Sequence, residues 1–319
     1  MRDEFVQTLT EIARRDPKVT LITGDLGFGV LDQFAHEFPA QYINAGVAEQ
    51  NMTGLAVGLA LEGKTVFTYS IANFPTLRCL EQIRNDACYH QANVKIVSVG
   101  GGFAYGPLGI SHHATEDLAV MRALPQITVL APADPIEVRG ATEALYKTPG
   151  TCYLRLGRGG EPVVHTAKPD FEVGRAIRVM SGSQVAVLTT GAMLKNAFDA
   201  CKALQAKGKR PALYSVHTIK PIDSALLKML GREFEVIITV EEHTVIGGLG
   251  SAVAETLSQI EQPRAQLKIV GLRDGFSSIV GDQAYLREAY GLSAPKIEAA
   301  IWESYRSARQ GVSSGLRVV

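Results

Sequence analysis

The chain has 319 residues, enough for two domains, and 46% of them are hydrophobic, so each domain can bury a sizeable core. Basic and acidic residues balance at a net charge of zero and form no basic block, which argues against a nucleic-acid partner. No apolar run approaches the ~18 residues of a membrane span, and the N-terminus has no signal-peptide apolar core. The four cysteines lack metal-ligand spacing, so we expect a cytoplasmic protein with reduced thiols.

The N-terminal residues predict a helix, a strand and a glycine-rich loop. Apolar residues recur at helical spacing over 2–15, and the β-branched run 19–23 is typical of a buried strand. Residues 24–29, Gly-Asp-Leu-Gly-Phe-Gly, follow at the strand's carboxyl end, where open parallel sheets carry ligand sites. Asp25 either caps this turn or contacts a ligand there.

The next segment joins a short strand to a helix of small residues. The apolar run 42–45 ends at a glycine, a polar corner follows, and the predicted helix contains Gly54 and Gly58. Two glycines four residues apart share one helix face and predict that another backbone comes close. Glu49 stands at the corner, either as a first-turn carboxylate that complements the helix dipole or as a buried acid or base.

A long loop follows the next two predicted strands. The elements are expected at 64–69 (strand), 77–91 (helix) and 94–99 (strand). Phe74, in the loop after the first of these strands, is either a core residue or a stacking partner for a flat ligand. The segment 100–117 is glycine-rich, which is typical of a functional loop, and it ends in His112 and His113. Adjacent histidines suit proton transfer or metal binding, but no matching set of metal ligands accompanies them.

The remaining chain continues the alternation of strands and helices, with one interruption at 161–175 that reads as a linker. Strands are expected at 127–131, 151–156, 185–190, 212–216, 236–240 and 267–271, and helices at 118–124, 136–147, 195–207, 224–230, 251–259 and 294–309. The pattern predicts two parallel-sheet α/β domains, at 1–160 and 176–310, and a disordered tail at 311–319. Arg155 and Arg158, near the end of the sixth strand, suit phosphate binding or a surface salt bridge.

The corner around Glu49 carries a family resemblance. Asn44-Ala45-Gly46-Val47-Ala48-Glu49-Gln50-Asn51 resembles the pyrimidine-domain signature of the transketolase family, which includes the deoxyxylulose-phosphate synthases. In that family the Glu hydrogen-bonds the aminopyrimidine of thiamine diphosphate and promotes its activation. The resemblance implies that Glu49 activates the cofactor, that Phe74 stacks on it beside Ile71, and that Asp25 lies near it at a subunit interface.

The same resemblance implies substrate contacts. Gly109-Ile110-Ser111-His112-His113 is similar to the family's Gly-Pro-Thr-His followed by Gln or His, so His112 would contact sugar oxygens, with His113 as a second candidate. Arg2 and Arg155 match phosphate-binding arginines, and Arg158 is the alternative to Arg155. Leu108 stands where relatives have an Asp that touches a substrate hydroxyl, which implies a sugar with fewer hydroxyls or another configuration.

The second half resembles the C-terminal domain of the same family. The match lies in Val240–His243 and in the glycine-rich helix start 246–250, which could bind an anion. In relatives this domain mainly builds the dimer, so the resemblance implies no catalytic role for Glu241, Glu242 or His243.

One part of the family pattern is missing from the chain. The Gly-Asp-Gly and, about 25–30 residues on, the Asn that hold the cofactor's diphosphate and Mg²⁺ in the family have no counterpart. The resemblance therefore implies the small half of a split, thiamine diphosphate-dependent transketolase. It would work in an α2β2 assembly with an N-terminal subunit that binds Mg²⁺, and would move a two-carbon ketol unit between sugar phosphates. The alternatives are a deoxyxylulose-phosphate-synthase-like or 2-oxoacid dehydrogenase β-type subunit, and a non-catalytic scaffold subunit.

Overall fold

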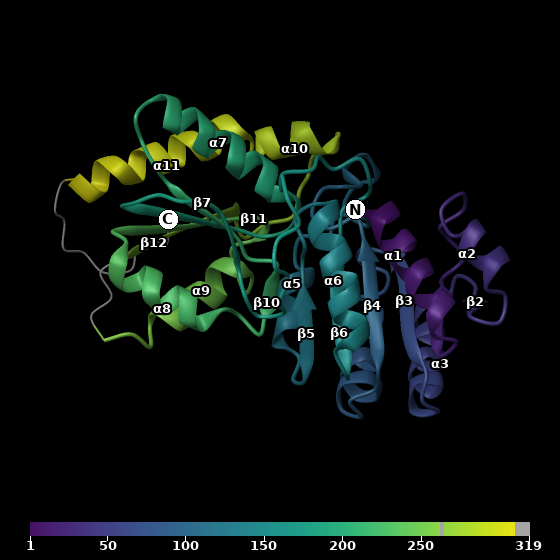
Figure 1. Ribbon diagram of the computed structural model, residues 1–319. Coiled ribbons are helices and arrows are strands. Elements are labelled where there is room, and N and C mark those ends of the chain that lie inside the picture. The colour runs from purple at the N-terminus through teal and green to yellow at the C-terminus, as the bar shows by residue number, and fades with distance from the viewer. Residues whose placement is uncertain (262–264, 310–319) are drawn as a thin grey trace.

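The computed structural model describes residues 1–261 and 265–309, which form two α/β units, each built on a mainly parallel sheet (Figure 1). The two-domain α/β prediction is confirmed, and the predicted tail lies outside the described residues. The first part of the chain forms α1 (Arg2–Arg15), β1 (Val19–Thr23), α2 (Asp32–Glu37), β2 (Tyr42–Asn44), α3 (Glu49–Leu61), β3 (Thr65–Ile71), α4 (Leu80–Gln82), η1 (Ile83–Cys88), β4 (Val94–Val99), η2 (Gly106–Leu108), α5 (Asp117–Ala123), β5 (Ile127–Leu130), α6 (Pro135–Lys147) and β6 (Thr151–Leu156). The second part forms β7 (Ile177–Met180), β8 (Val185–Thr189), η3 (Gly191–Met193), α7 (Leu194–Ala206), β9 (Ala212–Ser215), β10 (Thr218–Lys220), α8 (Ser224–Glu233), β11 (Val236–Thr244), α9 (Leu249–Leu257), β12 (Gln266–Leu272), α10 (Gln283–Ala289) and α11 (Ala294–Arg309).

The larger sheet has seven strands in the order β10-β5-β6-β4-β3-β1-β2, and all but β10 run parallel to their neighbours. Every residue of β1, β4 and β6 is buried, as expected for strands that helices cover on both faces. The register pairs Thr23 with Tyr69 and Ser98 with Arg155. The carboxyl ends of four central strands therefore meet at one edge, where their loops converge.

The edge strand β10 belongs to the second half of the chain. It runs antiparallel to β5, with Thr218 paired to Leu130, and the His217 carbonyl accepts a 2.8 Å hydrogen bond from the Ala131 amide. The second part of the molecule thus completes the sheet of the first. Residues 160–175 contain neither helix nor strand.

The smaller sheet has the order β12-β11-β8-β9-β7, with β7 antiparallel at its edge. Helices α7 and α11 cover one face and α8 and α9 the other (Figure 1). In the first unit, α1 lies beside α6, and Arg139 of α6 forms ion pairs with Glu4 and Glu11 of α1. Each sheet is therefore a layer between helices, with the cores on its two faces.

Helix α3 exposes its glycine face. A Cβ on Gly54 or on Gly58 would meet no atom within 4 Å, and Leu55 and Leu61 on the same helix are also exposed. The prediction that another backbone approaches these glycines is therefore wrong within the described chain. Each of these two glycines lowers the stability of helix α3 by about 1 kcal/mol relative to alanine, and no contact within the described chain requires a glycine there.

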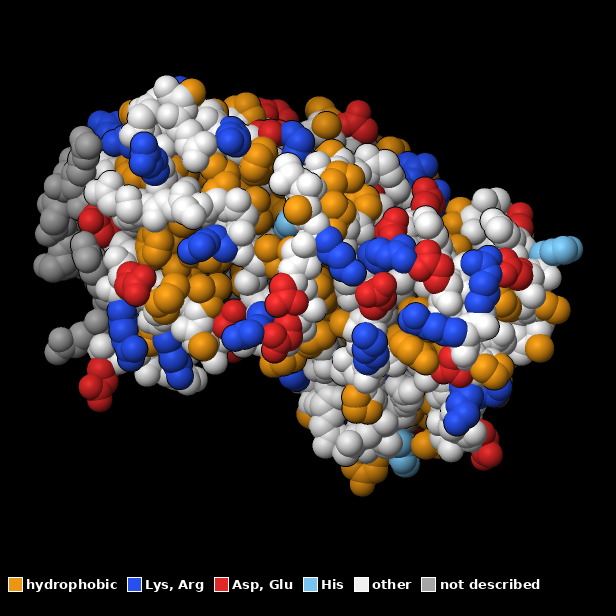
Figure 2. Space-filling model, viewed as in Figure 1, with side chains coloured by type: hydrophobic (Ala, Val, Ile, Leu, Met, Phe, Trp, Pro, Cys, Tyr) orange, Lys and Arg blue, Asp and Glu red, His pale blue; other side chains and the backbone are white. Residues whose placement is uncertain are grey.

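The surface is mixed in charge. Figure 2 shows basic and acidic side chains interspersed over the visible face, in keeping with the zero net charge. None of the described helices combines the length and the apolar character needed to cross a membrane.

Strongly patterned elements match their predictions, and short ones do not. Helices α1 and α11 have the predicted bounds. The helix predicted over 77–91 is a short α4 followed by the π-helical turn η1, and α2, β7, β10 and α10 were missed. The strand predicted over 236–240 continues to Thr244, because its backbone still pairs with β12, where Thr244 lies opposite Leu272.

Candidate functional site

The candidate site lies over the carboxyl ends of β1, β3, β4 and β6, where ligand sites of open α/β sheets are found. Four loops meet there, at residues 24–31, 72–79, 100–116 and 157–160. The loop after β4 is held at its base by a two-residue bridge between Gly102 and Ala114. Gly102 has φ +64°, and any Cβ there would meet the Glu242 side chain at 2.7 Å, so the tight return of this loop requires glycine.

Glu49 is the first residue of α3 and is only 2% exposed. Gly24 makes room for it, because a Cβ at that position would lie 3.3 Å from Glu49 Cγ. The carboxylate accepts a 2.6 Å hydrogen bond from Arg78 Nη1. The structure thus brings a buried carboxylate to the loop edge and supplies one cation beside it.

Phe74 is half-buried in the loop that follows Ile71, and its amide donates to the Ile71 carbonyl at 2.9 Å. The guanidinium carbon of Arg78 lies 4.7 Å from the Phe74 ring centroid. The His112 ring also meets Phe74 edge-on, with a centroid separation of 5.2 Å. Phe74 therefore links the Glu49 end of the site to the loop that carries His112.

His112 is half-buried near the tip of the loop after β4. Its Nδ1 shares a 3.0 Å hydrogen bond with Ser111 Oγ. Burial, and then the neighbouring His113, lower the pKa of His112, which favours the neutral ring that can accept or donate a proton. Asn73 fixes this segment, since its side-chain amide donates to the His113 carbonyl at 2.6 Å.

Two arginines and a tyrosine lie beyond His112. The Tyr105 ring centroid is 6.2 Å from that of His112, and the guanidinium carbon of Arg158 lies 5.3 Å from the Tyr105 centroid. Arg2 reaches the same corner, because a Cβ on Gly159 would lie 3.7 Å from its Nη2. Arg158 is exposed and Arg2 partly so, and cations in such a position can bind a phosphate.

These pairwise contacts connect six residues in series, and we call this series the site row. Its members are Glu49, Arg78, Phe74, His112, Tyr105 and Arg158. A carboxylate stands at one end, a phosphate-compatible cation at the other, and a titratable ring in the middle. This arrangement can hold a flat ring near the carboxylate while a chain of hydroxyls extends past His112 to an anionic end.

Two predicted substrate contacts face into the protein instead. His113 is 1% exposed, its Nε2 lies 3.1 Å from the Gly106 carbonyl and its ring packs edge-on against Phe103. The proposed substrate contact does not fit such a position. His113 instead stabilises the loop after β4, because both of its contacts are with residues of that loop.

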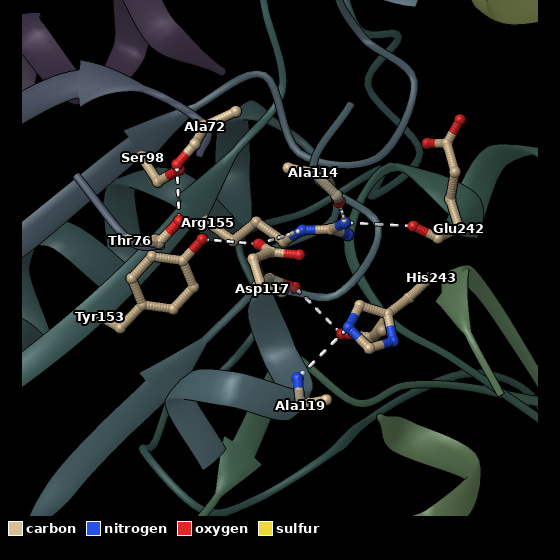
Figure 3. Close-up of polar contacts among 12 residues, drawn as sticks. Ala72, Thr76, Ser98, Ala114, Asp117, Ala119, Tyr153, Arg155, Glu242 and His243 are labelled. Atoms are coloured by element: carbon tan, nitrogen blue, oxygen red, sulfur yellow. Dashed lines mark hydrogen bonds and ion pairs between the residues drawn. The ribbon is translucent and has the colours of Figure 1, made fainter. Parts of the chain in front are cut away.

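Arg155 is 5% exposed and bridges three segments (Figure 3). Its Nε donates to Asp117 Oδ2 at 2.9 Å, and its Nη2 donates to the carbonyls of Ala114 and Glu242 at 2.7 and 3.1 Å. Burial lowers and Asp117 raises the pKa of Arg155, and the net shift is upward, so the side chain stays charged. Neither the surface salt bridge nor the phosphate contact considered from the sequence describes this buried position.

The polar end of β11 has structural partners as well. Glu242 pairs with Arg287 at 2.9 Å. His243 Nε2 accepts from the Ala119 amide at 3.2 Å, and these two residues are labelled in Figure 3. The Glu241 carboxylate accepts from the amides of Leu249 and Gly250. The helix start that could bind an external anion is thus filled by the chain's own carboxylate.

Two further predicted residues lie at the surface of the site. Asp25 is exposed with φ +56°, and its carboxylate accepts a 2.8 Å hydrogen bond from the Asn44 side chain, next to Gly24 and hence near Glu49. Leu108 is 55% exposed, in the turn that precedes His112. Among residues 1–261 and 265–309, no group of three or more His, Cys, Asp or Glu is placed to hold a metal ion.

Sequence reasoning missed three members of the neighbourhood: Arg78, Tyr105 and Asn73. Arg78 follows Phe74 by four residues, but Phe74 lies in a loop, where this spacing does not indicate a side-chain pair as it does in a helix. Tyr105 is an aromatic residue set among glycines in the long loop. Nothing in the local sequence marks Asn73.

Two family profiles match the chain. "Transketolase, pyrimidine binding domain" matches residues 1–161, and "Transketolase, C-terminal domain" matches residues 174–297. The first covers the part of the chain that carries the site row.

Several curated proteins are similar to this chain. One subunit of the apulose-4-phosphate transketolase of Phocaeicola vulgatus is 38% identical over 276 residues, 86% of this chain and 87% of that protein. The 6-deoxy-6-sulfo-D-fructose transketolase subunit SqwH of a Clostridium species is 34% identical over 304 residues, 95% of this chain and 94% of that protein. The 1-deoxy-D-xylulose-5-phosphate synthase of Aromatoleum aromaticum is 35% identical over 303 residues, but these make up only 47% of that protein.

Solved structures give the same result. A structure described as "Split gene transketolase, inactive beta4 tetramer" superposes with a TM-score of 0.87 at 38% identity, over 96% of this chain and 98% of that chain. The transketolase of Leishmania mexicana superposes with a TM-score of 0.79 at 20% identity, over 99% of this chain and 47% of that one, and shows the shared fold.

Proposed function

The chain belongs to the transketolase family, and from this membership we propose that it is the small subunit of a heteromeric, thiamine diphosphate-dependent transketolase. The reaction transfers a two-carbon ketol unit from a ketose phosphate to an aldose phosphate. The observation that carries the proposal is the site row, which runs from the buried Glu49 carboxylate past His112 to Arg158.

The residues at the Glu49 end fit the aminopyrimidine of the cofactor. When bound, thiamine diphosphate supplies the nucleophilic carbon that takes up the two-carbon unit. Glu49 would hold a proton at a ring nitrogen, and the half-buried Phe74 and Ile71 would contact the ring. Asp25 would lie near the same ring, at the contact with the partner subunit.

The substrate would lie along the rest of the site row. The neutral His112 would contact sugar oxygens and move a proton at its Nε2, since Nδ1 is engaged by Ser111. Arg158 and Arg2 would bind the phosphate, and they replace Arg155 in that role because Arg155 is enclosed. Leu108 would face a part of the sugar that offers no hydroxyl.

The partner would be an N-terminal transketolase subunit that holds the diphosphate and Mg²⁺, in an α2β2 complex. The exposed apolar face of α3, with Gly54, Leu55 and Gly58, would contact that subunit. We propose that the chain alone is inactive, in line with the description of the split-gene relative as an inactive β4 tetramer.

A second candidate is a subunit with deoxyxylulose-phosphate-synthase-like activity, favoured by the similarity to synthases over 93% of this chain. One set of assays separates the candidates. The chain, co-purified with its N-terminal subunit, should transfer ketol units from a ketose phosphate to an aldose phosphate. Condensation of pyruvate with glyceraldehyde 3-phosphate would support the synthase, and cofactor binding without any turnover would support a scaffold. Calorimetry of the lone chain with thiamine diphosphate and Mg²⁺ should show only weak binding, and micromolar affinity there would contradict the need for a partner.

A further inference from the structure

Arg78 stands between the two residues that the proposed function assigns to the aminopyrimidine. It donates to Glu49 at 2.6 Å, and its guanidinium carbon lies 4.7 Å from the centroid of the Phe74 ring. Arg78 keeps 47% of its side chain exposed, whereas the Glu49 side chain is 3% exposed. In the described parts of the chain, Arg78 supplies the only hydrogen bond that the Glu49 carboxylate accepts.

A guanidinium and an aminopyrimidine share the features that this place recognises. Both are flat and delocalised, and both stack on an aromatic face. A guanidinium donates N–H groups to a carboxylate, and an aminopyrimidine ring nitrogen does so once it carries the proton that it shares with Glu49. A carboxylate that is buried without a partner is strongly disfavoured, so Glu49 needs a donor whenever no ligand is bound. Because Arg78 contacts both the Glu49 carboxylate and the Phe74 ring, a ligand ring that made the same two contacts would have to take its place.

We infer that Arg78 is an internal placeholder for the aminopyrimidine. In the chain without cofactor it occupies the place between Glu49 and Phe74 and compensates the buried charge. When the cofactor binds, the guanidinium moves out to solvent, which its exposed side already allows. The inference rests on the proposed function and goes beyond it, because it adds a resident group that the cofactor must displace.

The first test needs no cofactor. Phenylglyoxal modifies accessible arginines, and mass spectrometry of peptides from the full chain reports the rate at each one. In Glu49→Gln the charge that holds Arg78 is gone, so Arg78 should be modified about three- to tenfold faster than in the wild type. Arg84 is the matched control, since it is exposed and bonds Asn85, and its rate should not change. Equal rates at Arg78 in both proteins would overturn the inference.

The second test measures binding of thiamine diphosphate with Mg²⁺ to the complex with the N-terminal subunit. Arg78→Met removes the competitor and keeps an apolar side chain of similar length, so affinity should rise about three- to tenfold, while the control Arg84→Met should bind as the wild type does. Weaker or unchanged affinity in Arg78→Met would overturn the placeholder alone. A wild-type complex that binds no thiamine diphosphate would overturn the proposed function and the placeholder with it.

Discussion

Replacing Arg155 by Met should destabilise the protein rather than weaken phosphate binding. The guanidinium is enclosed, and it holds the Asp117 carboxylate together with two carbonyls that belong to the site loop and to β11. Met fills a similar volume but donates no hydrogen bond. Asp117, which is 1% exposed, would keep only the 2.6 Å hydrogen bond from the Tyr153 hydroxyl.

The expected loss can be estimated from these contacts. Breaking a buried ion pair by removing one partner costs about 3–5 kcal/mol, because the remaining charge is left uncompensated. The entropy of unfolding is about 2.1 cal/mol/K per residue, so in a chain of 319 residues 1 kcal/mol shifts Tm by roughly 1.5 °C, and Tm should fall by roughly 4 °C or more. Combining Arg155→Met with Asp117→Asn should restore part of the loss, since the amide carries no charge and still accepts from Tyr153.

Differential scanning calorimetry of the full chain measures this loss, with Arg158→Met as the matched control. Arg158 is exposed, so its replacement should change stability by no more than about 0.5 kcal/mol. In the complex, Arg158→Met should raise KM for the phosphorylated donor. The reasoning would be refuted if Arg155→Met left Tm unchanged and raised KM for the phosphorylated donor more than Arg158→Met did.

Four other variants test the remaining parts of the account. Glu49→Gln should lower ketol transfer by the complex about 10²–10⁴-fold at unchanged Tm, and near wild-type turnover would contradict its role. Leu108→Asp should shift relative kcat/KM towards xylulose 5-phosphate about 10–100-fold in competition with modified ketoses, whereas no shift would place Leu108 away from the substrate. Gly58→Ala should stabilise the lone chain by up to about 1 kcal/mol in thermal unfolding but weaken co-purification of the partner, and unimpaired co-purification would argue against the α3 contact. Burial raises the pKa of Glu137 to about 7. The stability that its neutral form supplies is therefore full below about pH 4.5 and is lost as the pH rises through 7. Between these pH values Glu137→Gln should become more stable relative to the wild type, and a difference in Tm that stays constant with pH would contradict this.

The sequence predicted those parts of the fold that local patterns control. The amphipathic stripe of α1 and the β-branched run of β1 specify their elements without help from the rest of the chain. Strand β10 has three residues, and only its pairing with β5 makes it a strand. No local pattern could reveal that partner.

The candidate site shows the same division. The corner motif located Glu49, and the loop glycines located the segment that carries His112. The sequence could not distinguish His112, which lies in the site, from His113, which is buried beside it, because adjacent residues point in different directions only once the loop is folded. The burial of the Arg155 side chain likewise depends on a residue that is distant in sequence. A Cβ on Gly101 would lie 2.5 Å from Arg155 Nε, so only glycine leaves room for it.

Strand β10 comes from the second half of the chain but belongs to the sheet of the first half, and this limits where the coding sequence can be divided. A break in the coding sequence within 160–175 would release an N-terminal fragment whose strand β5 exposes unpaired N–H and C=O groups at the sheet edge, a template for aggregation. The other fragment would carry a three-residue strand with nothing to pair with. Gene fission or domain shuffling at this linker would therefore produce two fragments that are both prone to misfold. We expect the two halves to stay together in one coding sequence.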